Sequence, residues 1–403
     1  MMKNVLAMIL AGGKGERLYP LTKDRTKPAV PFGGIYRIID FTLSNCVNSN
    51  IRKIYVLTQY KSISLNRHIQ LGWNFFSSQL GEFISLIPAQ QRLDEHWYLG
   101  TADAIFQNFY TLQQEGPDLA LILSGDHIYK MNYNEMIQYH LAKEADLTVG
   151  TMQMPCSTSR EFGVIEVDRD YRVIGFQEKP EHPRTLPGNP DAILASMGIY
   201  VFNTEILVRR LIQDAKRRGS SHDFGRDVIP SMVSRDTVYA FNFWDEERME
   251  PKYWRDVGTV DAYWEANMDL VSVTPQFNLY DSEWPIHTCY TPFPPAKTVH
   301  SEIGRTGTVT NSIISGGCIV SGGRAENSIL SPNVHIHSYA EVTDSIVMEG
   351  VSIGRRARIR RTIIDKGIEV PEGMEIGFNL GEDRRRFTVT DSDIVVIPKG
   401  LRL

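Results

Sequence analysis

The sequence has few cysteines, no long apolar stretch and no strong excess of either charge. Its 403 residues contain four cysteines, which are widely spaced and include no Cys-x-x-Cys pair. We therefore expect reduced thiols, mostly in the core, and neither a disulfide framework nor a zinc site. No run of eighteen or more apolar residues occurs, so a membrane-spanning helix is not expected. The formal net charge of −5 argues against a general nucleic-acid binder, and anionic ligands would have to be held by local basic clusters.

The amino terminus enters its first apolar segment without a signal-type or transit-type extension, which leads us to expect a cytoplasmic protein. The length allows two or three domains and a sizeable core. Changes in the sequence pattern divide the chain into three parts: residues 1–271, a proline-spaced linker packed by its aromatic residues at 272–300, and residues 301–403.

A glycine-rich segment close to the amino terminus is the most informative stretch. Residues 5–10 are apolar at every position, which is typical of a parallel strand with both faces covered. The turn that follows contains three glycines, Gly12, Gly13 and Gly15. Without a Cβ they let backbone amides approach a ligand, and phosphates are the ligands that such loops bind. Arg17 and Lys27 add a guanidinium and an ammonium group.

Three glycines alone are equally typical of a tight turn with no ligand. Their spacing matches neither the dinucleotide-binding fingerprint nor the Walker loop. Here, however, the glycines are followed by Arg17-Leu18 and then by Lys27-Pro28, and this combination resembles the signature of sugar-1-phosphate nucleotidyltransferases.

Apolar segments alternate with helical patterns up to about residue 150. Residues 54–57, 119–123 and, as a shorter segment, 147–149 are predicted strands. Such alternation indicates βαβ units and a parallel sheet that binds ligands at the carboxyl ends of its strands. Asp126 follows one of these strands, on the same edge as the glycine turn. An isolated aspartate there often caps the next helix, but this placement favours a magnesium ligand.

Between residues 160 and 260 the pattern changes to hairpin-like strands at 163–167 and 173–177. Lys179 follows the second strand and precedes a proline, so we expect an extended backbone there and a side chain that contacts a substrate phosphate. Asp256 lies in a segment rich in aromatic residues and glycine. It is either a buried aspartate satisfied by Arg255 or by backbone amides, or the partner of Asp126 around one magnesium ion.

The carboxyl-terminal part has a six-residue rhythm. Aliphatic residues recur every five or six positions from Leu330 to Ile376, with small or turn residues between them. This repeat predicts a parallel β-helix of roughly four or five triangular coils. It resembles the left-handed β-helix found behind several nucleotidyltransferases. The predicted fold is therefore a Rossmann-like α/β domain with a mixed, mostly parallel sheet, followed by a left-handed parallel β-helix.

The signature predicts attack by the phosphate oxygen of a sugar 1-phosphate on the α-phosphorus of a nucleoside triphosphate, with release of pyrophosphate. Both reactants are polyanions, so catalysis requires positioning and neutralisation of charge. We expect Arg17 and the glycine amides to neutralise the pyrophosphate, Lys27 the α-phosphate and Lys179 the sugar phosphate. Mg²⁺ on Asp126 and Asp256 would bridge the triphosphate.

One family in particular resembles nearly the whole chain: the bacterial glucose-1-phosphate adenylyltransferases. The shared segments are at residues 27–30, 32–34, 37–41, 43–46, 88–92, 97–104, 125–130, 221–225, 253–259, 294–297, 371–374 and 385–387. The resemblance implies that ATP and glucose 1-phosphate give ADP-glucose for glycogen synthesis. It also implies a homotetramer, regulated by metabolites that bind between the catalytic domain and the β-helix.

The resemblance also implies two sets of substrate contacts. The adenine and ribose side would be lined by Gln90, Tyr98, Gly100 and Thr101. Glucose 1-phosphate would be surrounded by Gly163, Glu178, Lys179, Ser196, Asp223 and Trp254. For Trp97 we expect a place in the core. Arginines with few acids nearby, above all Arg384, Arg385 and Arg386, form a candidate site for a phosphorylated effector.

Other functions are also compatible with this pattern. A related nucleotidyltransferase that uses UTP, dTTP or GTP differs in nucleotide preference, and the segment at 97–104 favours ATP. A non-catalytic regulatory subunit would have lost cations or carboxylates that this chain retains. Hexapeptide coils also occur in acyltransferases, where His335 or His337 would be the candidate base, but four or five coils carry no obvious coenzyme A-binding extension.

Overall fold

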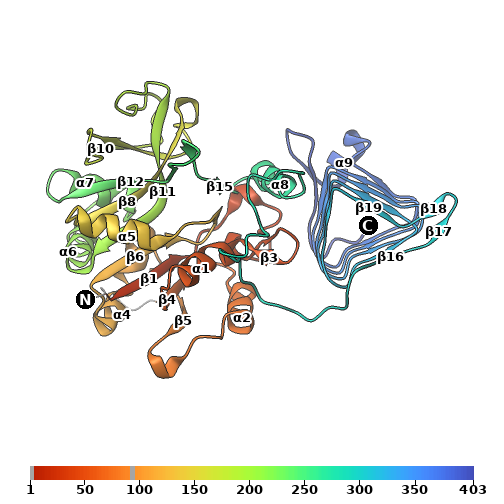
Figure 1. Cartoon of the computed structure of the whole chain (residues 1–403), viewed down its shortest axis with the longest axis horizontal. Coiled ribbons are helices and arrows are strands. Elements are labelled where there is room, and N and C mark those ends of the chain that lie inside the picture. The colour runs from red at the N-terminus through yellow and green to blue at the C-terminus, as the bar shows by residue number, and fades with distance from the viewer. Residues whose placement is uncertain (1–3, 91–95) are drawn as a thin grey trace.

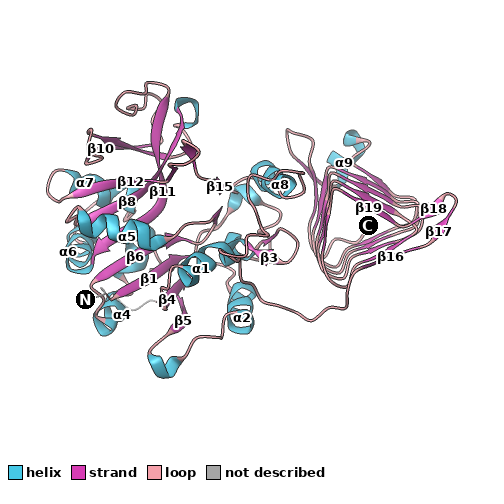
Figure 2. Ribbon diagram, in the orientation of Figure 1, coloured by secondary structure: helices cyan, strands magenta, loops and turns pink. Residues whose placement is uncertain are grey.

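The computed structural model describes residues 4–90 and 96–403, and it has two parts side by side (Figure 1). An α/β part contains the amino-terminal two thirds of the chain, and a triangular stack of short strands contains the rest (Figure 2). Among the described residues, no helix is both long enough and apolar enough to cross a bilayer.

A nine-stranded sheet forms the centre of the α/β part. Its parallel core consists of β1 (Val5–Leu10), β4 (Lys53–Thr58), β5 (Phe83–Pro88) and β6 (Leu119–Ser124). The long strand β11 (Ala192–Asn203) pairs antiparallel with β6, so the sheet is mixed. The remaining strands are β8 (Leu147–Pro155), β9 (Gly163–Val167), β10 (Val173–Glu178) and β12 (Val238–Asn242).

The predicted strands at 5–10 and 163–167 have the expected bounds. The segment predicted at 147–149 is much longer, because β8 pairs with β11 on one side and with β12 on the other over most of its nine residues.

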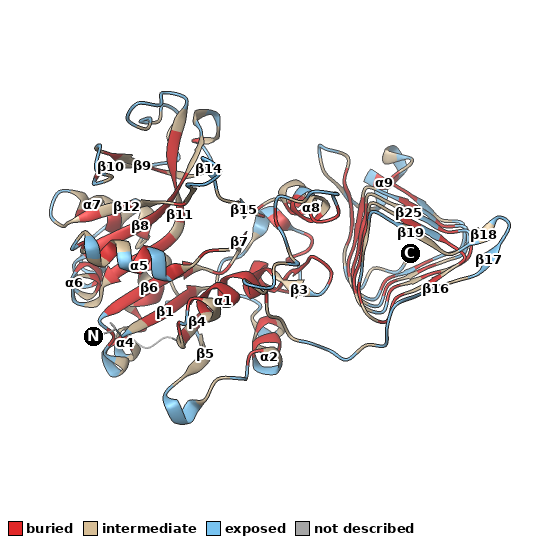
Figure 3. Ribbon diagram, viewed as in Figure 1, coloured by how far each residue is buried: buried red, intermediate tan, exposed pale blue. Residues whose placement is uncertain are grey.

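Helices cover the sheet, and apolar clusters fill the space on its two faces (Figure 3). The α-helices of the described residues are α1 (Ile38–Asn48), α2 (Ile63–Gly72), α3 (Thr101–Phe106), α4 (Phe109–Glu115), α5 (Tyr133–Ala142), α6 (Thr204–Ala215), α7 (Ile229–Val233), α8 (Val260–Asp269) and α9 (Leu380–Arg386). Short ribbons of two strands complete this part: β2 (Pro31–Phe32) with β3 (Tyr36–Arg37), β7 (His127–Tyr129) with β15 (Trp254–Asp256), and β13 (Trp244–Asp245) with β14 (Glu250–Pro251).

The triangular stack is a left-handed parallel β-helix, as predicted. Its first face contains β16 (Lys297–Val299), β21 (Ile319–Ser321), β24 (His335–Ile336), β27 (Ser352–Ile353) and β30 (Glu369–Val370). Its second face contains β19 (Thr308–Thr310), β22 (Arg324–Glu326), β25 (Glu341–Thr343), β28 (Arg358–Arg360) and β31 (Glu375–Ile376). Its third face contains β20 (Ile313–Ile314), β23 (Ile329–Leu330), β26 (Ile346–Val347), β29 (Thr362–Ile364), β33 (Val395–Ile397) and the antiparallel β32 (Thr388–Val389).

Equivalent residues stack from coil to coil along each face. Ile329 pairs with Ile346, and Ile346 pairs with Ile363. Ile336, Ile353 and other inward-facing aliphatic side chains are fully buried in the interior of the stack. A hairpin, β17 (Ser301–Glu302) with β18 (Arg305–Thr306), projects from one corner (Figure 1).

The described residues between α8 and β16 form neither helix nor strand, but they follow the surface of the α/β part. Trp284 donates a hydrogen bond to Asn45, and the backbone N–H of His287 donates one to Ser44, both on α1. Of the aromatic residues predicted to pack this segment, Phe277 is buried, whereas Tyr280 and Tyr290 are exposed.

Polar and apolar contacts hold the β-helix against the α/β part. A bidentate pair joins Arg25 Nη2 to the carboxylate of Asp365 at 2.8 and 2.7 Å, and both side chains are buried. Tyr263 on α8 belongs to the same apolar cluster as Ile329 and Ile346 of the stack. The two parts therefore share one continuous packed interface.

The four cysteines are free thiols, as expected. Cys46 and Cys318 are buried, and Cys156 and Cys289 are partly buried, so half of them belong to the core.

Candidate active site

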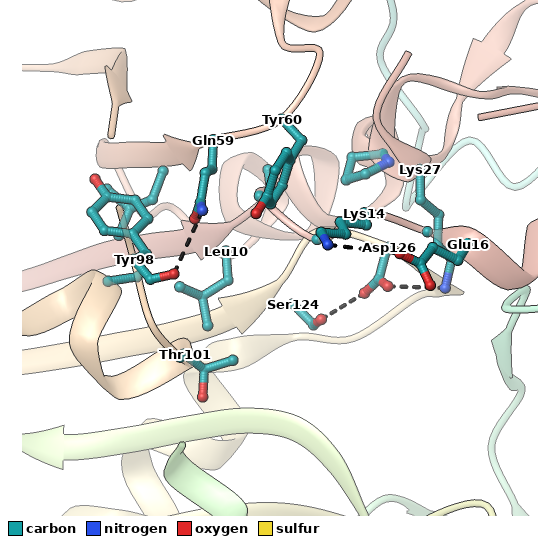
Figure 4. Close-up of a pocket in the computed structure, with 18 of the residues that line it drawn as sticks. Leu10, Lys14, Glu16, Lys27, Gln59, Tyr60, Tyr98, Thr101, Ser124 and Asp126 are labelled. Atoms are coloured by element: carbon teal, nitrogen blue, oxygen red, sulfur yellow. Dashed lines mark hydrogen bonds and ion pairs between the residues drawn. The ribbon is translucent and has the colours of Figure 1, made fainter. Parts of the chain in front are cut away.

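The carboxyl ends of the parallel strands β1, β4 and β6 meet at one edge of the sheet. The glycine turn follows β1, Gln59 follows β4, and Asp126 follows β6. A cavity of about 750 Å³ opens there (Figure 4). Its lining includes ten of the predicted site residues: Gly12, Gly13, Gly15, Arg17, Lys27, Tyr98, Gly100, Thr101, Asp126 and Asp223.

The glycine turn fits tightly against its neighbours. Gly15 has a φ of +62°, which disfavours any other residue, and a Cβ there would lie 3.1 Å from the Cβ of Lys27. The carbonyl oxygen of Gly15 accepts a hydrogen bond of 2.9 Å from Thr22. Thr26 donates one of 3.2 Å to the carbonyl oxygen of Ala11. The turn and the loop that carries Lys27 therefore form one packed unit.

Lys27 lies between two aspartates that are distant in the sequence. Its Nζ donates hydrogen bonds of 2.9 Å to Asp126 Oδ2 and 2.7 Å to Asp256 Oδ1. Burial disfavours the charged ammonium, but the two carboxylates outweigh this effect and raise the pKa of Lys27. Burial also disfavours ionised Asp126, yet Lys27, His127 and a hydrogen bond from Ser124 hold the pKa of Asp126 well below its usual value.

Backbone pairing explains why the aspartates meet. Asp256 on β15 is the register partner of His127 on β7, and Asp126 directly precedes His127. Ser124 Oγ donates a hydrogen bond of 2.6 Å to Asp126 Oδ1, which fixes the carboxylate (Figure 4). The sequence also allows a hydrogen bond from Arg255 to Asp256, and this contact does not form. Asp256 instead accepts a hydrogen bond from Lys27, and Arg17 lies 3.8 Å away.

The three side chains Asp126, His127 and Asp256 offer ligand atoms within 4.8 Å of one another. Two carboxylate oxygens are hard donors of the kind that divalent cations such as Mg²⁺ prefer. Lys27 Nζ bonds one oxygen of each aspartate, so the two carboxylates are directed at a shared positive charge. The donor set therefore fits a divalent metal ion.

A second group of polar side chains surrounds Gly225 and Gly163. A Cβ on Gly225 would lie 3.3 Å from Glu178 Oε2 and 3.4 Å from Asp223 Oδ1, so the two carboxylates flank this glycine. A Cβ on Gly163 would approach Phe176 within 2.6 Å and Glu178 Oε2 within 3.2 Å. Both glycines thus leave room for the side chain of Glu178.

The carboxylates of this second group affect each other. Burial and the charge of Asp223 raise the pKa of Glu178, against the opposing charges of Lys179 and Arg226. Burial, together with the charges of Asp223 and Glu178, raises the pKa of Tyr200 to about 12, although a hydrogen bond with Ser196 opposes the shift. Predicted residues Glu178, Ser196 and Asp223 are therefore brought together, with Tyr200 as an additional member.

Lys179 is exposed and follows β10, as predicted, but its backbone is not extended. Its φ is +49°, because its N–H turns back to donate a hydrogen bond to the carbonyl oxygen of Phe162 at the base of the hairpin. The prediction of an extended conformation before the proline is therefore wrong.

Trp254 is buried and packs edge-on against His127 and Phe162, with ring centroids 4.8 and 5.6 Å away. It lies beside the aspartate pair rather than in the lining of the large cavity. Gln90 is exposed at the end of a described segment and does not line that cavity. Trp97, expected in the core, is 55% exposed. Gln91 and Arg92 of the shared segment at 88–92 lie outside the described residues.

Sequence reasoning missed several residues at this site. Gln59, Tyr60, Lys14 and Ser124 line the cavity, and His127 is the third potential ligand. Gln59 donates a hydrogen bond of 3.5 Å to the carbonyl oxygen of Tyr98 (Figure 4). The sequence could have indicated Gln59 and Tyr60, because they come just after the predicted strand at 54–57. The carboxyl end of that strand lies on the same edge of the sheet as the glycine turn.

The arginine clusters in the β-helix have more acidic partners than the sequence indicates. Arg384 pairs with Asp393 at 2.9 Å, and Arg385 pairs with Glu382 at 2.7 Å. Arg356 and Arg358 pair with Glu372 and Glu375, both at 2.7 Å. The expectation of few acids nearby is wrong: Arg384 and Arg385 have acidic partners within nine residues in the sequence, and the next coil brings glutamates alongside Arg356 and Arg358.

Comparison with known proteins agrees with this geometry. Residues 6–273 match the nucleotidyl transferase family model, and residues 294–397 match the model of a GlmU-like carboxyl-terminal hexapeptide region. A glucose-1-phosphate adenylyltransferase of Koribacter versatilis is 53% identical, covering 100% of this chain and 97% of that protein. Proteins of the same name from Rhodopirellula baltica and Methylococcus capsulatus are 53% and 51% identical, covering 99% and 98% of this chain and 91% and 93% of theirs.

The fold and the charged edge of the sheet define a nucleotidyltransferase, a class of enzymes that generally use a divalent metal ion. Within this class the identities extend over nearly the whole length of both chains. The chain belongs to the glucose-1-phosphate adenylyltransferase family, as its sequence motifs predicted.

Proposed function

We propose that this chain transfers the adenylyl group of ATP to glucose 1-phosphate in the presence of Mg²⁺, giving ADP-glucose and pyrophosphate. One observation carries the proposal: a buried lysine and two aspartates meet at the edge of a cavity whose wall is a glycine turn. This arrangement supplies positive charge where two polyanions must approach each other.

At the nucleotide end, the amides of Gly12, Gly13 and Gly15 and the guanidinium of Arg17 bind the β- and γ-phosphates and stabilise the departing pyrophosphate. Arg17 suits this role because its side chain is 67% exposed while it lines the cavity. Lys27 neutralises charge on the α-phosphate, where the new bond forms. Tyr98, Gly100 and Thr101 line the nucleoside side, and we assign Gln90 to that side from the family pattern.

At the sugar end, Lys179 binds the phosphate that attacks, and the acceptor-rich group of Glu178, Ser196 and Asp223 binds the sugar hydroxyls. Hydroxyl groups donate hydrogen bonds to carboxylates, so this group selects a polyhydroxylated ring. Gly163 leaves the space that Glu178 needs, and Trp254 supports the floor beside His127.

Asp126 and Asp256 would hold Mg²⁺, which supplies a Lewis acid that offsets charge on the triphosphate when bound. The side chains of this chain do not need to act as acid, base or nucleophile, because the attacking phosphate is already ionised. Their task is to align the attacking and leaving oxygens and to exclude alternative orientations.

We further propose that residues 1–271 form the catalytic domain and that residues 301–403 serve regulation and oligomerisation, joined by the linker at 272–300. ADP-glucose would supply glycogen synthesis, the enzyme would be a cytoplasmic homotetramer, and phosphorylated metabolites would regulate it. At the buried interface Arg25 and Lys366 are already paired with Asp365 and Glu349 at 2.7 and 2.6 Å, so an effector would have to compete with these acids there. The exposed arginines at 384–386 remain a second candidate.

The test is pyrophosphate release from glucose 1-phosphate with ATP, UTP, dTTP and GTP compared at equal concentration. ATP is expected to give the highest kcat/KM. Preference for UTP or dTTP would identify a sister enzyme instead, and binding of glucose 1-phosphate without turnover of any nucleotide would identify a regulatory subunit.

A further inference from the structure

Thr101 connects the two ends of the site through one hydroxyl group. Its Oγ1 donates a hydrogen bond of 2.9 Å to Asp223 Oδ2 and accepts one of 3.0 Å from the backbone N–H of Phe224. A hydroxyl has a single proton, so these two partners fix its orientation completely. Both residues line the nucleotide cavity, and Asp223 also belongs to the acceptor-rich group beside Glu178.

The rest of Asp223 is held equally firmly. Its Oδ1 accepts hydrogen bonds of 2.9 and 3.1 Å from the backbone N–H groups of Gly225 and Arg226. Thr101 therefore supplies the hydrogen bond that fixes the second oxygen. This bond matters because the charge of Asp223 raises the pKa of Glu178, so the two carboxylates repel each other when both are ionised.

The backbone around Thr101 is clamped to the same turn. The carbonyl oxygen of His222 accepts hydrogen bonds from the N–H groups of Ala102 and Asp103 at 2.9 and 3.3 Å. A Cβ on Gly100 would overlap that carbonyl oxygen, so only glycine allows this approach. These hydrogen bonds and this close approach join the start of α3 to the turn at 221–225.

We propose that Thr101 is a positioning residue for the sugar, acting through Asp223, although it lies in the nucleotide cavity. This inference rests on the proposed function and reassigns one residue within it. The hydroxyl of Thr101 holds the Asp223 carboxylate in the orientation in which it accepts a sugar hydroxyl. Loss of that hydroxyl leaves Asp223 Oδ2 without its partner while Oδ1 stays bonded to the turn, so the orientation of the carboxylate plane is less well defined and recognition of the sugar suffers, whereas binding of the nucleotide does not.

The experiment compares Thr101→Val with Thr101→Ser in the full-length enzyme, varying ATP and glucose 1-phosphate in turn. A hydrogen bond to a charged group is worth enough to raise the KM for glucose 1-phosphate about tenfold in Thr101→Val. The KM for ATP is expected to stay within about twofold, and Thr101→Ser, which keeps the hydroxyl, should restore both values. Thr362→Val is the matched control, because its hydroxyl donates a hydrogen bond of 2.8 Å to the carbonyl oxygen of Arg360 in the β-helix and not to Asp223.

A double-mutant cycle then asks whether the effect passes through Asp223. In an Asp223→Ala background, Thr101→Val should cause almost no further rise in the KM for glucose 1-phosphate. A rise that persists there, or a rise confined to ATP, overturns the proposal. If the valine variant does not fold, Thr101→Ala, which adds no bulk beside Phe224, replaces it and should give the same changes in KM. Wild-type enzyme that releases no pyrophosphate would contradict the proposed function instead, before any variant is compared.

Discussion

Lys27 donates a hydrogen bond of 2.7 Å to Asp256, a residue 229 positions further along the chain. The same ammonium bonds Asp126, and the lysine side chain is only 8% exposed. A charge that is buried in this way interacts strongly with its neighbours, because little water screens it. The contact joins the loop after the glycine turn to strand β15 and so assembles the charged centre of the site.

Lys27→Met should lower kcat by about 10²-fold or more, because a preorganised cation at the reacting phosphate is lost. Steady-state rates of pyrophosphate release measure the effect. Lys14→Met is the matched control, since Lys14 lines the same cavity but is 60% exposed and lies 3.8 Å from Glu16. An equal loss in both variants would contradict the special role of Lys27.

Removal of divalent cations with a chelator should abolish turnover, and added Mg²⁺ should restore it. Asp126→Asn should reduce turnover about 10²-fold or more without restoration at saturating Mg²⁺, because one anionic ligand is gone. Circular dichroism should show an unchanged fold. Full recovery of the variant at high Mg²⁺ would mean that Asp126 only strengthens metal binding.

Lys179→Ala should mainly raise the KM for glucose 1-phosphate, because an exposed ammonium contributes binding energy to the sugar phosphate. Initial rates at saturating ATP give this constant. Lys399→Ala, an exposed lysine of the β-helix, provides the control. An unchanged KM in Lys179→Ala would remove Lys179 from the sugar site.

Asp365→Asn should lower the free energy of unfolding by about 3–5 kcal/mol, because it leaves the buried guanidinium of Arg25 without its counter-charge. Urea unfolding monitored by fluorescence and circular dichroism measures the change. Glu372→Gln breaks the exposed pair with Arg356 and should cost at most about 1 kcal/mol. Similar losses in the two variants would show that burial of the Arg25 pair has little energetic weight.

Glu178→Gln should raise the melting temperature at pH 7 but not below pH 4. The pKa of Glu178 is raised in the folded chain, so its ionised form disfavours folding above the ordinary pKa, whereas the protonated form carries no such penalty. Melting curves from pH 4 to pH 7 test whether the substitution stabilises or destabilises the folded chain. The same variant should also show a higher KM for glucose 1-phosphate. A variant that is less stable at pH 7 would show that Glu178 is stabilised by its neighbours.

Patterns that depend on one segment at a time were readable from the sequence. The strand at 5–10 is apolar throughout because both faces are covered, and the six-residue repeat follows from the geometry of a triangular coil. The end of a parallel strand also locates Asp126 without any knowledge of its partners, since ligands gather at that edge.

Contacts between distant segments were not readable in the same way. Nothing in the local sequence indicates that Asp256 pairs with His127, or that Glu375 lies beside Arg358 on the next coil. The exposed position of Trp97 was missed for a related reason, because an aromatic residue within a glycine-containing segment has no periodic pattern that separates core from surface.

Arg25 and Lys27 belong to the same short loop, and Asp365 holds that loop from the opposite side of the interface. The β-helix therefore helps to fix the loop that carries Lys27. We therefore expect the position of the Lys27 ammonium, and with it the rate of the reaction, to respond to substitutions in the β-helix that alter the contact between Arg25 and Asp365.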